Sequence, residues 1–188
     1  DKIPTALVRD PDNRTKVLPE ITPGCEWVFA GEGVPTRKWD GTCVMLDENE
    51  KWWARREVKP GKTPPENYVV VNFDEVTGKT QGWEPIEQSS YFKFFEEALH
   101  RFTMTDEVFR GQTYELVGPK VNGDQDRIGY HTLKSHEDAP IIPDLAYMQL
   151  SPETVIKIVR KIGIFPGWEG VVWHHPDGRM AKLKARDV

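Results

Sequence analysis

The sequence predicts an α+β fold built mainly from antiparallel sheets with flanking helices. Strand-like runs are joined by short polar turns, two of which contain Asp, Asn or Gly as hairpin turns commonly do. Helical patterns are interspersed among these runs without the regular strand–helix–strand rhythm of a parallel sheet. The 15 glycines and 15 prolines indicate many turns and long loops. We expect one domain over residues 1–188, because the sequence contains no evident domain boundary.

The first quarter of the chain contains an arm and then strands. Residues 1–24 are polar and proline-rich, so we expect an irregular N-terminal arm. Glu26–Ala30 resembles a short strand that ends at glycines. Two further strand-like runs, Thr42–Leu46 and Trp52–Arg56, are separated by the polar residues 47–50 and predict a hairpin.

The middle of the chain predicts a long loop, a helix and a strand. Residues 59–85 contain several prolines and predict a long loop around a short strand at residues 69–71. Ser90–Phe102 has apolar residues at helical spacing, with Ser89 or Ser90 as N-cap. Thr113–Val117 has the composition of a strand.

The last quarter predicts a helix followed by a hairpin. Ser151 and the proline that follows it begin a helix that continues to about Ile162 and stops at Gly163. Glu169–His174 and Met180–Lys184 flank a Pro-Asp-Gly turn, which predicts two antiparallel strands.

Composition and charge exclude several classes of protein. The net charge of −5 argues against binding of nucleic acid by bulk electrostatics alone. No run approaches the ~18 apolar residues of a membrane helix, so we expect no membrane partner. Two cysteines, Cys25 and Cys43, are too few for a disulfide scaffold, and the expected location is cytoplasmic.

Chemistry is suggested by Lys38, which we expect in a tight connection between two strands that ends in Asp-Gly, and by two further lysines near the C-terminus. Lys182 and Lys184 alternate with Leu183 on a predicted strand, so the two lysines project from one face. On the neighbouring strand, Glu169 and Val171 are also expected to share a face. Lysines beside a carboxylate and an apolar residue suit an anion attached to a flat apolar ring. The alternative is a solvated hairpin with a weak ion pair.

Five blocks of residues follow one another in a fixed order. They are Lys38–Cys43; Trp53–Arg55 with Lys59–Pro60; Glu115–Gly118 with Asn122–Gly123; Glu169–His174 with Asp177–Gly178; and Lys182–Lys184. This series resembles the covalent nucleotidyltransferase superfamily of ATP-dependent ligases and capping guanylyltransferases. It is most similar to compact ATP-dependent 5′-to-3′ RNA ligases, over residues 26–186. The resemblance implies an adenylyltransferase (nucleotidyltransferase) domain of ATP-grasp-like ligase type.

The resemblance also implies the reaction and the roles of individual residues. A lysine forms a covalent lysyl-AMP with ATP, AMP passes to an RNA 5′-phosphate, and an RNA 3′-hydroxyl then displaces AMP to seal the strand. The implied roles are Lys38 as nucleophile; Glu169 as ligand of Mg²⁺, with Mn²⁺ as an alternative; Lys182 and Lys184 at the triphosphate; Glu115 at the ribose hydroxyl; Arg55 at ribose or phosphate; Val171 against adenine; and Asp40 and Gly41 shaping the turn that presents the nucleophile.

Two residue assignments stay open at this point. Arg56 is an alternative to Arg55, because neighbours on a strand point to opposite faces and only one faces a pocket. The flat residue expected opposite Val171 has three candidates, namely Tyr130, His131 and His136. Adjacent His174 and His175 are not expected to share a metal, for the same reason of alternation.

Three functions are compatible with these observations. The first is ATP-dependent RNA ligation in RNA repair, with ATP and RNA carrying 5′-phosphate and 3′-hydroxyl ends as partners and no protein partner inferred. The second is a DNA-joining or guanylyl-transferring relative, which the four residues remaining after Lys184 disfavour, because they leave no room for the OB-type domain of larger members. The third is a non-enzymatic single-strand nucleic-acid-binding module, which the net charge disfavours.

Overall fold

The structure, a computed structural model, describes residues 3–188. The chain forms two compact units and passes between them at Trp39–Asp40 and again at Asp138–Ala139. Unit 1 comprises Asp40–Asp138, and unit 2 comprises Ile3–Trp39 with Ala139–Val188. The sequence predicts one domain because no linker-like composition marks either passage.

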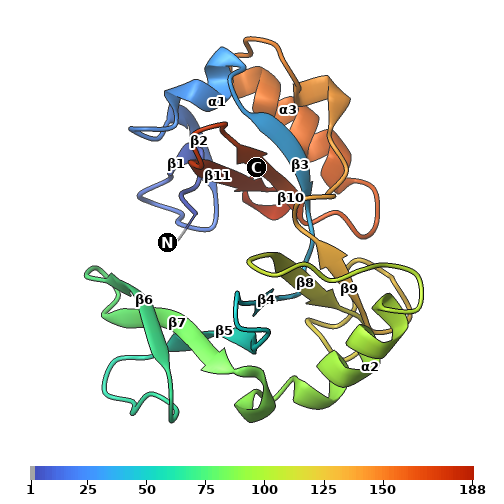
Figure 1. Cartoon of the computed structure of the whole chain (residues 1–188). Helices are drawn as coiled ribbons and strands as arrows, with labels where there is room; N and C mark the ends of the chain where they lie inside the picture. Colours follow the sequence, from blue (N-terminus) through green and yellow to red (C-terminus); the bar gives the residue numbers. More distant parts are fainter. Residues whose placement is uncertain (1–2) are drawn as a thin grey trace. The chain divides into compact units, whose positions relative to one another are not determined.

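Unit 2 combines two small sheets with helices (Figure 1). Its elements are β1 (Leu7–Arg9), β2 (Val17–Ile21), α1 (Glu26–Ala30), β3 (Val34–Lys38), η2 (Pro143–Leu145), α3 (Pro152–Gly163), β10 (Gly170–His174), β11 (Met180–Lys184) and η3 (Ala185–Asp187). Strands β1 and β2 pair with each other, and the other three form an antiparallel sheet in the order β11-β10-β3.

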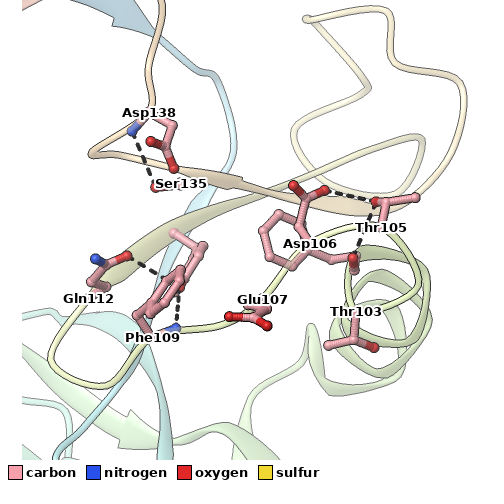
Figure 2. A pocket seen from close by; sticks show the side chains of 10 residues that line it. Thr103, Thr105, Asp106, Glu107, Phe109, Gln112, Ser135 and Asp138 are labelled. Atoms are coloured by element: carbon pink, nitrogen blue, oxygen red, sulfur yellow. Dashed lines mark hydrogen bonds between the residues drawn. The ribbon is translucent and has the colours of Figure 1, made fainter.

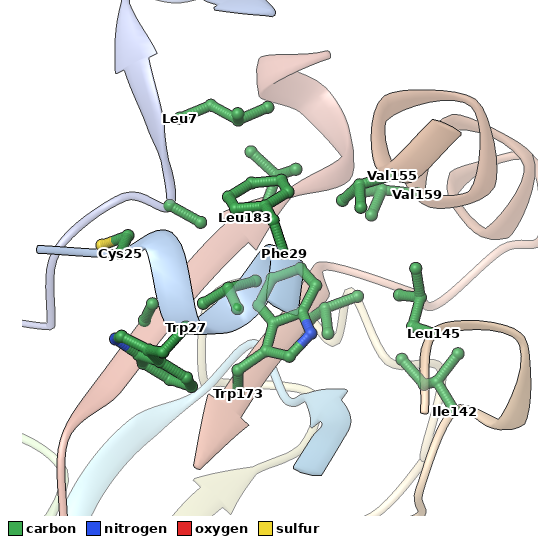
Figure 3. Packing of buried hydrophobic residues seen from close by; sticks show 14 residues of the cluster. Leu7, Cys25, Trp27, Phe29, Ile142, Leu145, Val155, Val159, Trp173 and Leu183 are labelled. Carbon is green, nitrogen blue, oxygen red and sulfur yellow. The ribbon is translucent and has the colours of Figure 1, made fainter. Parts of the chain in front are cut away.

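One face of the three-stranded sheet is the core face of unit 2. Trp173 and Leu183 project from β10 and β11 and are buried together with Phe29 of α1 and Val155 and Val159 of α3 (Figure 3). Helix α3 forms because its apolar side chains recur every three to four residues and Ser151 accepts the N–H of Thr154 as N-cap, at 3.3 Å. The helices therefore leave the opposite face of the sheet for polar side chains.

Unit 1 is built on one six-stranded antiparallel sheet, in the order β6-β7-β5-β4-β8-β9. Its elements are β4 (Thr42–Leu46), β5 (Trp52–Val58), β6 (Val69–Asp74), β7 (Lys79–Pro85), η1 (Ile86–Gln88), α2 (Phe92–Phe102), β8 (Thr113–Val117) and β9 (Thr132–Ser135). Phe95 and Ala98 of α2 are buried against Val44 and Tyr114 of the sheet. The covered face of this sheet thus carries the residues that alternate with Glu115 along β8.

The predicted α+β class with mainly antiparallel sheets is confirmed, as are the hairpins β4–β5 and β10–β11, helices α2 and α3, and strand β8. Helix α2 begins after Tyr91 without a side-chain cap, so the expected serine N-cap is wrong. The long loop predicted at 59–85 contains a second strand, β7, and forms the hairpin β6–β7.

None of the helices within residues 3–188 has the length and apolar character needed to cross a membrane.

Three predictions near the N-terminus are corrected. Glu26–Ala30 is a helix and not a strand, because a short apolar run fits either element; the left-handed Gly31, with φ of 80°, ends it. The expected irregular arm contains the β1–β2 pair within residues 3–24, while residues 1–2 lie outside the described part. Lys38 ends strand β3 and does not lie in a connection between strands. The strand at Lys38 depends on pairing with Gly170 of β10, a distant segment that local patterns do not reveal.

Candidate active site

Two lysines and one glutamate meet at one end of the three-stranded sheet of unit 2. Strand register places Lys38 and Lys184 on either side of Gly170, and Glu169 comes directly before that glycine. The Nζ atom of Lys38 lies 2.5 Å from Glu169 Oε2, and the Nζ atom of Lys184 lies 2.5 Å from Glu169 Oε1. The Glu169 side chain is only 6% exposed. One buried carboxylate therefore binds two ammonium groups, and the cluster has a surplus positive charge that suits an anion.

Gly170 permits this convergence. A Cβ atom at Gly170 would lie 2.2 Å from the backbone oxygen of Leu183 and 2.7 Å from the Cα of Lys184. Its φ of 157° is also one that side-chain-bearing residues rarely adopt. The Glu-Gly pair is thus a steric requirement for bringing β10 this close to β11.

The alternation expected around Glu169 and Val171 is corrected by the structure. Val171 pairs with Leu183, and both are fully buried on the core face, so Val171 does not line the lysine face. Val172, which pairs with Lys182 and Thr36, lies on the lysine face instead. Glu169 precedes the strand, and its side chain reaches the lysines from there. Strict alternation starting at Glu169 therefore does not predict which valine shares the lysine face.

The lysine face continues along the strands with a hydroxyl and an imidazole. Lys182 is half-buried on this face, two residues before Lys184. The Thr36 hydroxyl lies 3.2 Å from the backbone oxygen of Val172 and 3.1 Å from His174 Nε2. Sequence reasoning considered His174 only as a metal ligand and missed its place here, although alternation from Lys182 through the β10–β11 register would have identified it.

In unit 1, the two residues after the passage at Trp39–Asp40 are bound by side chains from distant positions. Asp126, which is buried, accepts the N–H of Asp40 at 2.7 Å. Asn122 donates to Asp40 Oδ1 at 3.0 Å and to the backbone oxygen of Gly41 at 2.9 Å. Glu115 Oε1 accepts the N–H of Gly41 at 3.1 Å. We call Glu115, Asn122 and Asp126 the turn clamp.

The turn clamp holds a main chain that has no room for a side chain. A Cβ atom at Gly41 would lie 2.1 Å from the backbone oxygen of Leu116 and 2.9 Å from Glu115 Cγ. Sequence reasoning missed Asp126, and no signal in the polar loop around it distinguishes it from its neighbours. The sequence weakly indicated that Asn122 belongs to the site, because Asn122 is part of one of the ordered blocks.

Glu115 has a second partner on its other oxygen. His136 Nε2 lies 3.0 Å from Glu115 Oε2, and His136 Nδ1 lies 2.8 Å from the Thr113 hydroxyl. The other two candidates for the flat residue have different surroundings. His131 pairs with Glu97 at 2.7 Å, and Tyr130 lies against the Arg101 guanidinium. Of the three candidates, His136 is the one that bonds to a predicted site residue, Glu115.

Strand register separates Arg55 from Arg56. Arg55 pairs with Trp83 and lies on the same face of the sheet as Glu115, where its guanidinium contacts Gln81 at 3.1 Å. Arg56 lies on the opposite face and pairs at 3.4 Å with Glu84, which is buried. The structure thus places Arg55, and not Arg56, on the face of the sheet that carries Glu115.

Residues that could hold a metal are few. Among residues 3–188, no three His, Cys, Asp or Glu side chains converge as a metal cage. Mg²⁺ is often held by one or two carboxylates together with substrate phosphates, so the Glu169 carboxylate on its cationic face fits that type of site. Both Glu169 oxygens also pair with ammonium groups, those of Lys38 and Lys184.

Unit 1 also contains a cavity of about 490 Å³ (Figure 2). It is lined by Phe102, Thr103, Thr105, Asp106, Glu107, Phe109, Gln112, Tyr114, Ser135 and Asp138. Burial raises the pKa of Tyr114, whose hydroxyl accepts the N–H of Phe109 at 2.8 Å. None of the predicted site residues is among those that line this cavity.

Comparison with known proteins gives distant structural likenesses alone. No family model matches the chain, and no curated protein matches it. A solved structure of a lysine-to-methionine mutant of the Naegleria gruberi RNA ligase with AMP and Mn is 12% identical, with a TM-score of 0.49, over 85% of this chain. This chain spans about half the length of that protein, at 51%. A likeness of this size assigns neither a family nor a reaction to the chain.

Proposed function

We propose that the chain is an ATP-dependent RNA ligase that acts through a lysyl-AMP intermediate on Lys38. The observation that carries the proposal is the Glu169 carboxylate bonded at 2.5 Å to both Lys38 and Lys184 on the sheet face opposite the core. Three cationic side chains on one face, with Lys182 the third, suit the phosphates of a nucleotide.

The first step joins Lys38 to AMP. The neutral Lys38 amine attacks the α-phosphorus of ATP, an N–P bond forms, the bond to the bridging oxygen breaks, and pyrophosphate leaves. Glu169 Oε2, already at hydrogen-bond distance from Nζ, is placed to accept the proton that the nitrogen loses. Lys184 and Lys182 would offset the negative charge that develops on the phosphoryl oxygens.

The later steps transfer AMP to an RNA end. The RNA 5′-phosphate attacks the phosphorus of lysyl-AMP, the N–P bond breaks, and the Lys38 amine leaves with a proton, which gives an RNA-adenylate. An RNA 3′-hydroxyl then attacks the 5′-phosphate, loses its proton and displaces AMP to seal the strand. We propose Glu115 as acceptor for the ribose hydroxyl, Arg55 as a contact to ribose or phosphate, and Val172 as the apolar wall against the base. Asp40 and Gly41 set the main chain that follows the nucleophile. Mg²⁺ or Mn²⁺, held by Glu169 together with the phosphates, would supply Lewis-acid stabilisation of the phosphoryl group.

Intact mass after incubation with ATP and Mg²⁺ tests the first step. Wild-type protein should gain one AMP, about 329 Da, and Lys38→Ala should gain nothing. Lys157→Ala is the matched control, because Lys157 is an exposed lysine on α3 and should leave the adduct unchanged. Absence of a wild-type adduct with ATP under Mg²⁺ and under Mn²⁺ would contradict the proposal.

A second experiment separates RNA ligation from related reactions. The purified adenylylated protein is mixed with nicked RNA or nicked DNA carrying 5′-phosphate and 3′-hydroxyl ends. Sealing of RNA without ATP supports the proposal. Sealing of DNA alone, or an adduct with GTP in place of ATP, assigns the chain to a DNA-joining or guanylyl-transferring reaction instead.

A further inference from the structure

His136 contacts a predicted nucleotide-binding residue, although it belongs to none of the ordered sequence blocks. It lies directly after β9 and bonds through both ring nitrogens, to Glu115 at 3.0 Å and to Thr113 at 2.8 Å. Because an ionised carboxylate only accepts hydrogen bonds, Nε2 carries a proton, and in the neutral ring Nδ1 then accepts from the Thr113 hydroxyl. The carboxylate thereby selects the tautomer, and the threonine hydroxyl helps to fix the orientation of the imidazole.

The other oxygen of Glu115 connects this pair to the nucleophile motif. Glu115 Oε1 accepts the N–H of Gly41, which lies three residues after Lys38 in the chain. Glu115 also packs directly against Gly41, because a Cβ atom there would be 2.9 Å from Glu115 Cγ. A rotation of the Glu115 side chain would therefore break the contact that holds the turn.

Burial makes the orientation of Glu115 sensitive to its partners. The Glu115 side chain is 12% exposed and the His136 side chain is 31% exposed, so water reaches the imidazole more easily than the carboxylate. A carboxylate this buried needs its hydrogen-bond partners, and removal of one favours a different rotamer. Each oxygen accepts two hydrogen bonds when ionised, so Glu115 retains lone pairs for a ribose hydroxyl while it holds Gly41 and His136.

We propose that His136 is a positioning residue for the adenylylation of Lys38. With Thr113, it holds the Glu115 carboxylate in the one orientation that both binds the Gly41 main chain and directs the remaining lone pairs to the nucleotide. This inference rests on the proposed function, and it adds to it two residues that act through Glu115 without touching the reacting atoms.

A double-mutant cycle on the single-turnover rate of adduct formation tests this role. The variants are His136→Ala, His136→Gln, Thr113→Val, Glu115→Ala and the His136→Ala/Glu115→Ala pair. We expect His136→Ala to slow the reaction about 10- to 100-fold and Thr113→Val about threefold. His136→Gln keeps an N–H donor and should recover part of the loss. The double variant should be no slower than Glu115→Ala alone, because the two residues act through the same carboxylate.

Controls separate positioning from folding and from loss of the proposed function. His100→Ala removes an exposed histidine on α2 and should react at the wild-type rate. Thermal melting identifies variants that fail to fold. Where Glu115→Ala reacts too slowly to measure, the same cycle is read on ATP affinity in the Lys38→Ala background.

The outcomes are distinct. If wild-type protein forms no adduct, the proposed function fails and this inference fails with it. If wild-type protein forms the adduct but His136→Ala reacts within twofold of it, only the inference fails. Losses that multiply in the double variant would mean that His136 acts independently of Glu115, which also overturns the positioning role.

Discussion

Glu169 in unit 2 and Glu115 in unit 1 are both nearly buried, and the two glutamates bind different kinds of partner. Glu169 in unit 2 binds two ammonium groups, from Lys38 and Lys184. Glu115 in unit 1 binds a backbone N–H and an imidazole, from Gly41 and His136. The first arrangement gathers charge that an anion can use. The second fixes the position of a main chain, which depends more on the geometry of the hydrogen bonds than on net charge.

The two units also differ in how their site residues are connected. In unit 2, three residues that the sequence singled out, Lys38, Glu169 and Lys184, contact one another directly. In unit 1, two of the three turn-clamp residues and the histidine behind Glu115 lie in or after the loop that follows β8. Substitutions in unit 2 should therefore alter charge-dependent chemistry, and substitutions in unit 1 should alter geometry.

The largest expected effect is at Glu169. Glu169→Ala leaves two half-buried ammonium groups without their carboxylate and removes the proposed proton acceptor, so adduct formation should slow by about 10³-fold. Glu169→Gln keeps the shape and loses the charge, and it should be almost as slow. Single-turnover mass measurements test both variants. If Glu169→Gln forms the adduct within threefold of the wild-type rate, the negative charge of Glu169 does not contribute to the reaction.

A smaller effect, about 100-fold on the same rate, is expected for Gly41→Ala. The new Cβ atom would lie 2.1 Å from the backbone oxygen of Leu116, so the turn must shift away from the clamp. Gly61→Ala is the control, because nothing lies within 4 Å of its Cβ position, although its φ of 73° also disfavours alanine. Both variants should lower Tm by a few degrees. Equal rates for the two variants would contradict a geometric role for unit 1.

Substitutions of the two adjacent arginines in unit 1 should change different quantities, the reaction rate for Arg55 and the Tm for Arg56. Arg55→Ala should slow adduct formation about tenfold with Tm near that of wild type, because Arg55 lies on the face of Glu115. Arg56→Ala should lower Tm and leave the rate nearly unchanged, because it leaves the buried Glu84 without its cation. Rates and melting curves of both variants decide this. The reverse pattern would place Arg56 and not Arg55 beside the nucleotide.

The smallest effect concerns two hairpin turns, one in each unit. The hydrogen bond from the Trp53 indole chiefly lowers the pKa of Asp47, and the backbone N–H of Arg179 chiefly lowers the pKa of Asp177. A folded pKa below the unfolded value of roughly 3.9 means that each ionised carboxylate stabilises the fold near neutral pH. This contribution decreases as the pH falls below about 4 and is lost below the folded pKa.

Melting curves at pH 6 and pH 3 check this dependence. Asp47→Asn and Asp177→Asn should each melt slightly below wild type at pH 6, and the difference should shrink at pH 3. Both carboxylates are on the surface, so the differences should be small in either unit. A difference in Tm that stays constant with pH would mean that the turns are held by shape and not by ionised carboxylates.

The sequence by itself determined the elements and residues whose signals are local. The hairpins β4–β5 and β10–β11 each consist of two strands joined by a turn-forming segment, and α3 has an N-cap residue and helical periodicity. Each of these elements can be predicted without knowledge of the rest of the chain. The ordered blocks also identified Lys38, Glu169 and Lys184 as a group, and these three side chains meet in the structure.

Only the tertiary structure decided which face each side chain occupies and which distant residues complete each site. The assignment of Val172 in place of Val171 depends on the register of β10 with β3 and β11 and on the position of Glu169 before the strand. The place of Arg55 depends on pairing across three strands, and Asp126 and His136 reach their partners from loops that have no periodic pattern. Strand register and loop conformation arise from contacts between distant segments, whereas local sequence patterns specify only the element in which a residue lies.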